Sequence, residues 1–172
     1  MVKEEKTVSF TDAKTQVEVA ITRIALLHLA YSRTLVEEIG QEKGKELIIK
    51  SIMEYGKMIG ERTNQHKQDL PKYGIHEKYE DGKVYGCVFA KIFHEYKEDG
   101  LGCLYCYVDA AKSMTVNPKR KLVHKECDAC GDDYCVFESV PTTEKEQNQF
   151  VEKDVEWKHV DPRLVEGVKR RL

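Results

Sequence analysis

The chain has 172 residues, of which 41% are hydrophobic and 34% charged, a composition typical of a single folded domain. Lysine and arginine total 28 and aspartate and glutamate total 30, so the formal net charge is −2 and no nucleic-acid partner is expected. The longest stretch without a charge, 24–32, has about 9 residues against the ~20 that a bilayer requires, so no membrane partner is expected either. The N-terminus mixes both charge signs and does not resemble a secretory signal, which predicts a cytoplasmic location.

Two long helices are predicted in the first third of the chain. Polar side chains at Ser9–Asp12 can cap a helix start, and Gly40 is a typical helix end. A second helix is predicted from about Gln41 to Asn64, so the pair forms a helical hairpin. Gly56 and Gly60 on it indicate the close approach of another backbone or of a ligand. The spacing of apolar residues predicts a buried stripe on the first helix of Val17, Ile21, Ile24, His28, Tyr31, Leu35 and Ile39, and one on the second of Ile48, Ile52, Tyr55 and Ile59.

Shorter elements are predicted in the remainder of the chain. In order, they are a hairpin of residues 75–79 and 83–85 around Asp81-Gly82, helices at 87–96 and 104–113, strands at 121–126 and 134–140 on either side of a cysteine-rich turn, and two short amphipathic segments around Trp157 and Leu164. This order predicts an α+β fold, in which an N-terminal helical hairpin and short helices pack on a small antiparallel sheet. We expect one domain, 1–172, with a flexible N-terminus at 1–10, a core at 11–140 and a C-terminal extension at 141–172.

The cysteines are the most informative residues, because five of the six lie between residues 103 and 135. In a reducing compartment they indicate free thiols, metal ligands or catalysts rather than disulfides. Two Cys-x2-Cys pairs and two further donors give six candidates for the four positions of a tetrahedral zinc ion, so spacing alone leaves the ligands open. Packing as small hydrophobic residues is the simpler alternative. The six candidate donors are Cys103, Cys106, His124, Cys127, Cys130 and Cys135.

Residues around this cluster resemble the L-2-amino-thiazoline-4-carboxylic acid hydrolase-like family. The resemblance covers approximately residues 15–140, and Cys87 falls where members of that family often carry another cysteine. The cysteine turn is also similar to the 4-vinyl reductase-type ligand-binding domain, in which a Glu-x2-Cys-x7-Cys unit and an upstream cysteine hold zinc. The motifs that carry these resemblances are Tyr105-Cys106-x2-Asp109, Asn117-Pro118, Gly131-Asp132-x2-Cys135-x-Phe137, and His124-x2-Cys127-x7-Cys135, where His replaces Glu.

The resemblance implies a hydrolase of a small cyclic amidine or thiazoline-type C–N or C–S compound. It also implies a fold shared with small trafficking-complex subunits, and a homodimer. Asp109 is the expected proton shuttle and Cys87 a further catalytic thiol lining the site. The expected cofactor is zinc, and its expected ligands are Cys106, His124, Cys127 and Cys135.

Several alternatives stay open at this stage. Without metal, Cys106 could attack as a thiolate, with His124 as its base. A non-catalytic, zinc-stabilised sensor or binding module for a small molecule would use Cys106 or Cys103, together with His124, Cys127 and Cys135, as ligands. A redox or metal-handling protein would use the surplus thiols Cys103 and Cys130.

Two histidines and one basic segment lie outside the expected ligand set. His28 is expected to be a core histidine with one satisfied hydrogen bond, whereas His94 could reach the site from its helix. Arg163 and the basic residues 169–171 are expected to form a solvated helix end.

Overall fold

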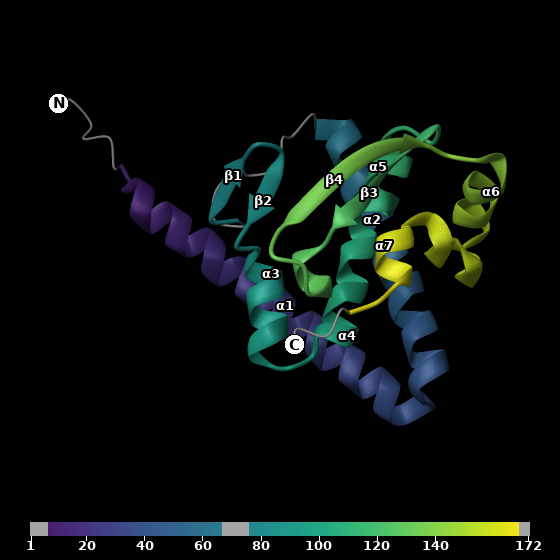
Figure 1. The fold of residues 1–172 in the computed structure, drawn as a ribbon, viewed down its shortest axis with the longest axis horizontal. Helices are drawn as coiled ribbons and strands as arrows, with labels where there is room; N and C mark the ends of the chain where they lie inside the picture. The colour runs from purple at the N-terminus through teal and green to yellow at the C-terminus, as the bar shows by residue number, and fades with distance from the viewer. Residues whose placement is uncertain (1–6, 67–75, 169–172) are drawn as a thin grey trace.

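The computed structural model describes residues 7–66 and 76–168 and confirms the α+β fold class, with helices packed on a small antiparallel sheet (Figure 1). The predicted strand start at Ile75, residues 1–6 of the N-terminus and the basic residues 169–171 lie outside the described residues. In chain order the elements are α1 (Phe10–Ile39), α2 (Gln41–His66), β1 (Lys78–Glu80), β2 (Lys83–Tyr85), α3 (Val88–Glu95), α4 (Asp99–Gly102), the 3-10 turn η1 (Cys103–Cys106), α5 (Tyr107–Val116), β3 (Arg120–Glu126), the 3-10 turn η2 (Asp128–Cys130), β4 (Cys135–Pro141), α6 (Glu144–Glu152), the 3-10 turn η3 (Val155–Val160) and α7 (Pro162–Val165).

The sheet has the strand order β1-β2-β4-β3, and every pairing is antiparallel. Asp81 (φ 50°) and Gly82 (φ 75°) close the predicted β1–β2 hairpin with the left-handed backbone that a tight two-residue turn requires. The β3–β4 register shifts between His124 and Glu126, next to the cysteine turn. Such bulges bend a strand, and this one lies where β3 leaves the sheet toward Cys127.

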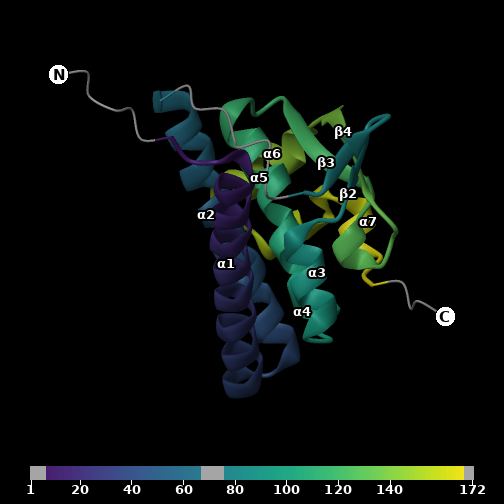
Figure 2. The same cartoon turned by 90° about the vertical axis from the view of Figure 1, so that its left-hand side faces the viewer.

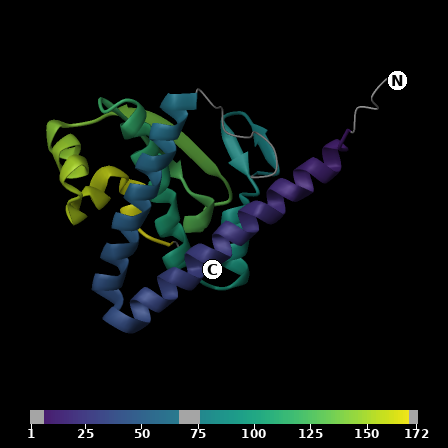
Figure 3. The ribbon, with the colours of Figure 1, turned by 180° about the vertical axis from the view of Figure 1, so that it is seen from behind.

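The molecule has three layers (Figure 2). The α1–α2 hairpin forms one outer layer, α3, α4 and α5 form the middle layer, and the sheet lies on the far side with α7 beside it. The hairpin has the predicted ends, because the Ser9 side chain accepts a hydrogen bond from the amide of Asp12 at 3.1 Å and Gly40 follows Ile39 with φ 83°. The N-terminal end of α1 projects away from the body of the molecule (Figure 3).

The predicted buried stripe of α1 is wrong in part. Ile24, Tyr31 and Ile39 are 36%, 66% and 43% exposed, whereas Ala25, Leu29 and Ser32 are buried. The buried face therefore lies about a quarter of a turn around the helix, where small side chains let α1 approach its neighbours closely.

Gly56 and Gly60 of α2 lie on the face of that helix that packs against α5. A Cβ on Gly56 would lie 2.5 Å from that of Ala111, and one on Gly60 would lie 2.6 Å from that of Thr115. Both contacts are too short for real side chains, and both neighbours belong to α5. The close approach expected at these positions is therefore that of a helix.

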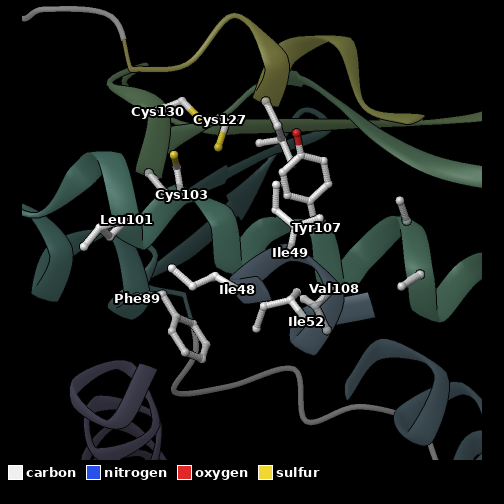
Figure 4. Close-up of a cluster of buried hydrophobic side chains, with 14 of the residues drawn as sticks. Ile48, Ile49, Ile52, Phe89, Leu101, Cys103, Tyr107, Val108, Cys127 and Cys130 are labelled. Carbon is white, nitrogen blue, oxygen red and sulfur yellow. The ribbon is translucent and has the colours of Figure 1, made fainter. Parts of the chain in front are cut away.

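The core continues through the C-terminal segment, beyond the expected limit at residue 140. Phe150, Trp157, Val160 and Leu164 join the same buried cluster as α2, α3 and α5 (Figure 4 shows part of it). α6 was not predicted as a helix, although Thr143 and Glu146 form a capping box at its start. Residues 141–165 are thus part of the packed domain.

Among the described helices, α1 is long and apolar enough to cross a membrane by length and composition alone. Its most apolar 18-residue window has a mean hydropathy of 1.2, and 17% of that window is buried. One such helix is weak evidence, because core helices of soluble proteins and N-terminal signal sequences meet the same criterion. The expectation of no membrane partner stays a prediction.

Candidate metal centre

Three of the expected donors form a compact group that could hold a metal ion. The ligand atoms of Cys106, His124 and Cys127 all lie within 4.8 Å of one another. The sulfur atoms of Cys106 and Cys127 are 4.0 Å apart. Two thiolates on one tetrahedral zinc ion, with bonds of about 2.3 Å, lie about 3.8 Å apart. The donor set and its spacing therefore fit a thiophilic ion such as zinc.

Cys127 is the central thiol of the group. Its thiol donates a hydrogen bond to Cys106, and interactions with the side chains of Cys106, Cys130 and Cys135 raise its pKa. Cys135 lies at the start of β4, outside the three-donor group, and its sulfur accepts the amide of Asp128 at 3.3 Å. Its contact with Cys127 lowers the pKa of Cys135, and this contact makes Cys135 a candidate for a fourth ligand.

His124 is held in one orientation by Asp161. The carboxylate Oδ2 of Asp161 accepts hydrogen bonds from the ring Nδ1 at 2.8 Å and from the backbone amide of His124 at 3.0 Å. Burial lowers the pKa of His124, but the bond to Asp161 and the charge of Asp109 outweigh it and raise the pKa. Because Nδ1 carries the proton donated to Asp161, Nε2 is the nitrogen available to a metal.

A second buried contact fixes the cysteine turn itself. Asp132 Oδ2 accepts hydrogen bonds from the amide of Cys127 at 2.7 Å and from Nε of Arg163 at 2.8 Å. Arg163 also donates from Nη2 to the carbonyl oxygen of Cys130 at 3.0 Å. The expectation that Arg163 is solvated is wrong, since its side chain is 5% exposed and holds this turn. We call Asp161 and Arg163 the C-terminal clasp.

Protein-family models, characterised proteins and solved structures give no match to this chain. The family resemblance therefore rests on the motif residues alone.

The clasp carries no local motif that identifies it as part of a metal site. Asp161-Pro162 indicates only a helix start, since the Asp161 side chain also caps α7.

The two expected catalytic residues lie beside the donors but differ in their surroundings. Asp109 lies three residues after Cys106, and its Oδ2 is 3.8 Å from Nε2 of His124. The other carboxylate oxygen, Oδ1, accepts a hydrogen bond from Lys112 at 3.0 Å. Cys87 precedes α3, and burial raises the pKa of its thiol, so this thiol is neutral. Asp109 is therefore the better placed of the two for proton transfer.

Two of the histidines outside the donor group, His28 and His94, make different contacts. His28 is a part-buried histidine whose Nε2 bonds the carbonyl oxygen of Leu101 at 3.0 Å, as expected. His94 contacts two carboxylates, with Nε2 3.3 Å from Oδ1 of Asp128 in the turn and Nδ1 against Asp99 of α4. These contacts link α3 and α4 to the turn without adding a ligand atom to the three-donor group.

Proposed function

We propose that this protein is a zinc-dependent hydrolase of a small cyclic amidine or thiazoline-type compound. The ligands would be Cys106, His124 and Cys127, and the bound ion would supply Lewis-acid activation of water. The observation that carries the proposal is the position of Asp109, a 22% exposed carboxylate whose Oδ2 is 3.8 Å from Nε2 of His124. Catalytic zinc sites have three protein ligands and keep a position for water, and a neighbouring carboxylate can handle the proton of that water.

Asp109, Lys112 and Asp161 have separate roles in the proposed reaction. Lys112 occupies Oδ1 of Asp109, which leaves Oδ2 to accept the proton of the attacking water. Water adds to the ring carbon between nitrogen and sulfur, and the C–N or C–S bond of that carbon then breaks. Asp109 returns the proton to the departing nitrogen or sulfur, so that the carboxylate is regenerated. Asp161 keeps the ring of His124 fixed throughout.

A metal-free mechanism with Cys106 as nucleophile is less well supported. The hydrogen bond with Cys127 lowers the pKa of Cys106, but burial and neighbouring charges raise it to about 11. Such a thiol is protonated at neutral pH, whereas nucleophilic attack requires the thiolate.

A zinc-stabilised binding module is the second candidate, and two observations favour it. Cys135 can supply a fourth ligand, which would close the metal site against water. A largely apolar cavity of about 370 Å³ also lies between α1 and α2, and Tyr105, the neighbour of Cys106, contributes to its wall. A cavity of this kind is typical of small-molecule sites.

Hydrolysis of 2-aminothiazoline-4-carboxylate and related cyclic amidines by zinc-loaded protein tests the first candidate. Asp109→Asn should lower turnover about 10²- to 10⁴-fold with zinc content unchanged. The exposed Asp133, changed to Asn, is the matched control and should keep full turnover.

Cys135→Ser separates the two candidates. In the hydrolase the variant keeps one zinc per chain, because three other residues hold the ion. In the binding module it loses zinc, and calorimetry detects binding of panel compounds to the parent protein without turnover. Zinc-loaded protein that neither binds nor hydrolyses the panel would contradict both candidates.

The expected homodimer and cytoplasmic location belong to the same proposal. α1 exposes Leu27 and Tyr31 beside the apolar cavity, and a second copy of this chain would cover them. Such exposed apolar faces are typical of interaction sites.

A further inference from the structure

Cys103 and Cys130 are two thiols that the metal centre does not use. Cys103 begins η1 and Cys130 ends η2, and their side chains lie in the buried core at 4% and 0% exposure. Neither belongs to the group of donors within 4.8 Å of one another. Figure 4 shows the sulfur atoms of Cys103, Cys127 and Cys130 turned toward one another between the two segments.

The two thiols are neighbours. Their side chains interact with each other, and their sulfur atoms face the same space in Figure 4. The thiol of Cys103 also lies 3.7 Å from the carbonyl oxygen of Gly100, which marks the other side of its pocket. A disulfide joins two sulfur atoms about 2.05 Å apart, so its formation requires the two side chains to move closer together.

We propose that Cys103 and Cys130 are a redox-active pair, which hydrogen peroxide converts into a disulfide separate from the metal ligands. The Cys130 sulfur attacks one peroxide oxygen, the O–O bond breaks, and Cys130 becomes a sulfenic acid as one water leaves. The Cys103 sulfur then attacks the Cys130 sulfur, the S–O bond breaks, and a second water leaves with the proton of Cys103. Two thiols lose two electrons, and the peroxide gains them.

Access to the buried pair depends on the C-terminal clasp. Arg163 of α7 bonds the carbonyl oxygen of Cys130 and thereby covers the turn. Because α7 has four residues, its local opening costs less than global unfolding and admits a molecule as small as hydrogen peroxide. Larger oxidants, such as a disulfide-bonded peptide, would react more slowly.

Hydrogen peroxide added to the zinc-loaded, full-length protein tests this assignment. We expect peptide mapping after differential alkylation to recover a Cys103–Cys130 disulfide. Two titratable thiols per chain should disappear, dithiothreitol should restore them, and zinc content should stay unchanged.

Variants of the pair give the matched controls. Cys103→Ala should remove the disulfide and leave a sulfenic acid on Cys130 that dimedone traps. Cys87→Ala changes a thiol outside the pair and should leave the disulfide yield unaltered. Disulfides that join Cys106, Cys127 or Cys135 with release of zinc would overturn the assignment, as would reduced Cys103 and Cys130 after peroxide treatment. Peptide mapping and thiol titration do not depend on hydrolysis. The redox assignment can therefore fail while the proposed function holds.

Discussion

The cysteine turn and α1 are held in the fold by opposite means. The turn is anchored by hydrogen bonds from distant segments, because Asp132 accepts both the amide of Cys127 and Nε of Arg163. α1 is anchored by one narrow apolar face around Ala25 and Leu29, while a second apolar face is exposed. Residue changes should therefore lower the free energy of unfolding strongly at the turn and only slightly on the exposed face of α1.

The strongest test of this contrast is removal of the central thiol. Cys127→Ser should abolish zinc binding and lower the free energy of unfolding by about 5 kcal/mol or more, because metal binding contributes directly to folding. Metal analysis and urea unfolding of the zinc-loaded protein measure both effects. Cys87→Ser makes the same chemical change outside the donor group and should retain zinc, and unchanged stability of metal-free Cys127→Ser would contradict a structural contribution from the ion.

The clasp should show the next largest effect. Arg163→Ala removes the buried guanidinium that pairs with the carboxylate of Asp132 and should lower the free energy of unfolding by about 3–5 kcal/mol. Lys153→Ala, which breaks only an exposed pair with Glu54, is the control and should cost about 1 kcal/mol or less. Equal effects of the two variants in urea unfolding would show that the turn does not depend on Arg163.

Helix packing away from the site should be less sensitive. Gly56→Ala places a Cβ 2.5 Å from that of Ala111, and the overpacking should cost about 1–3 kcal/mol by thermal unfolding. Gly100→Ala meets open space in a short helix and serves as the comparison. If both variants unfold at the same temperature, α2 and α5 do not pack as closely as described.

The smallest change in stability is expected on the exposed face of α1. Tyr31→Lys should alter the free energy of unfolding of the isolated chain by about 0.5 kcal/mol or less, because the side chain is 66% exposed. It should nevertheless shift the protein from dimer to monomer in light scattering, if a second copy covers this face. A parent protein that is monomeric at all concentrations would remove the homodimer from the proposed function.

Local signals predicted most of the fold. Ser9 and Gly40 marked the ends of α1, and Asp81-Gly82 marked the β1–β2 turn, because capping and tight turns depend on neighbouring residues. Spacing placed Cys106, His124 and Cys127 among six candidate donors, and the structure brings these three together. The buried face of α1 was misjudged because the helix carries two apolar faces, and the periodicity does not say which one meets α2 and α3.

The supports of the site could not be predicted in the same way. Asp161 lies 37 residues from His124 and Arg163 lies 31 residues from Asp132, so their pairing depends on the tertiary fold. A single sequence offers no local pattern for such a pair, and Arg163 in a basic segment is more typical of a solvated end.

The C-terminal clasp is expected to close late in folding. Cys106, Cys127 and the ring of His124 can approach one another once β3 and α5 have packed, but Asp161 orients that ring only after η3 and α7 have closed over it. Contacts between distant segments form late, because the chain entropy lost in closing the loop has to be overcome first. If metal uptake requires the oriented ring, it follows the closure of η3 and α7, and its rate would report that late step of folding.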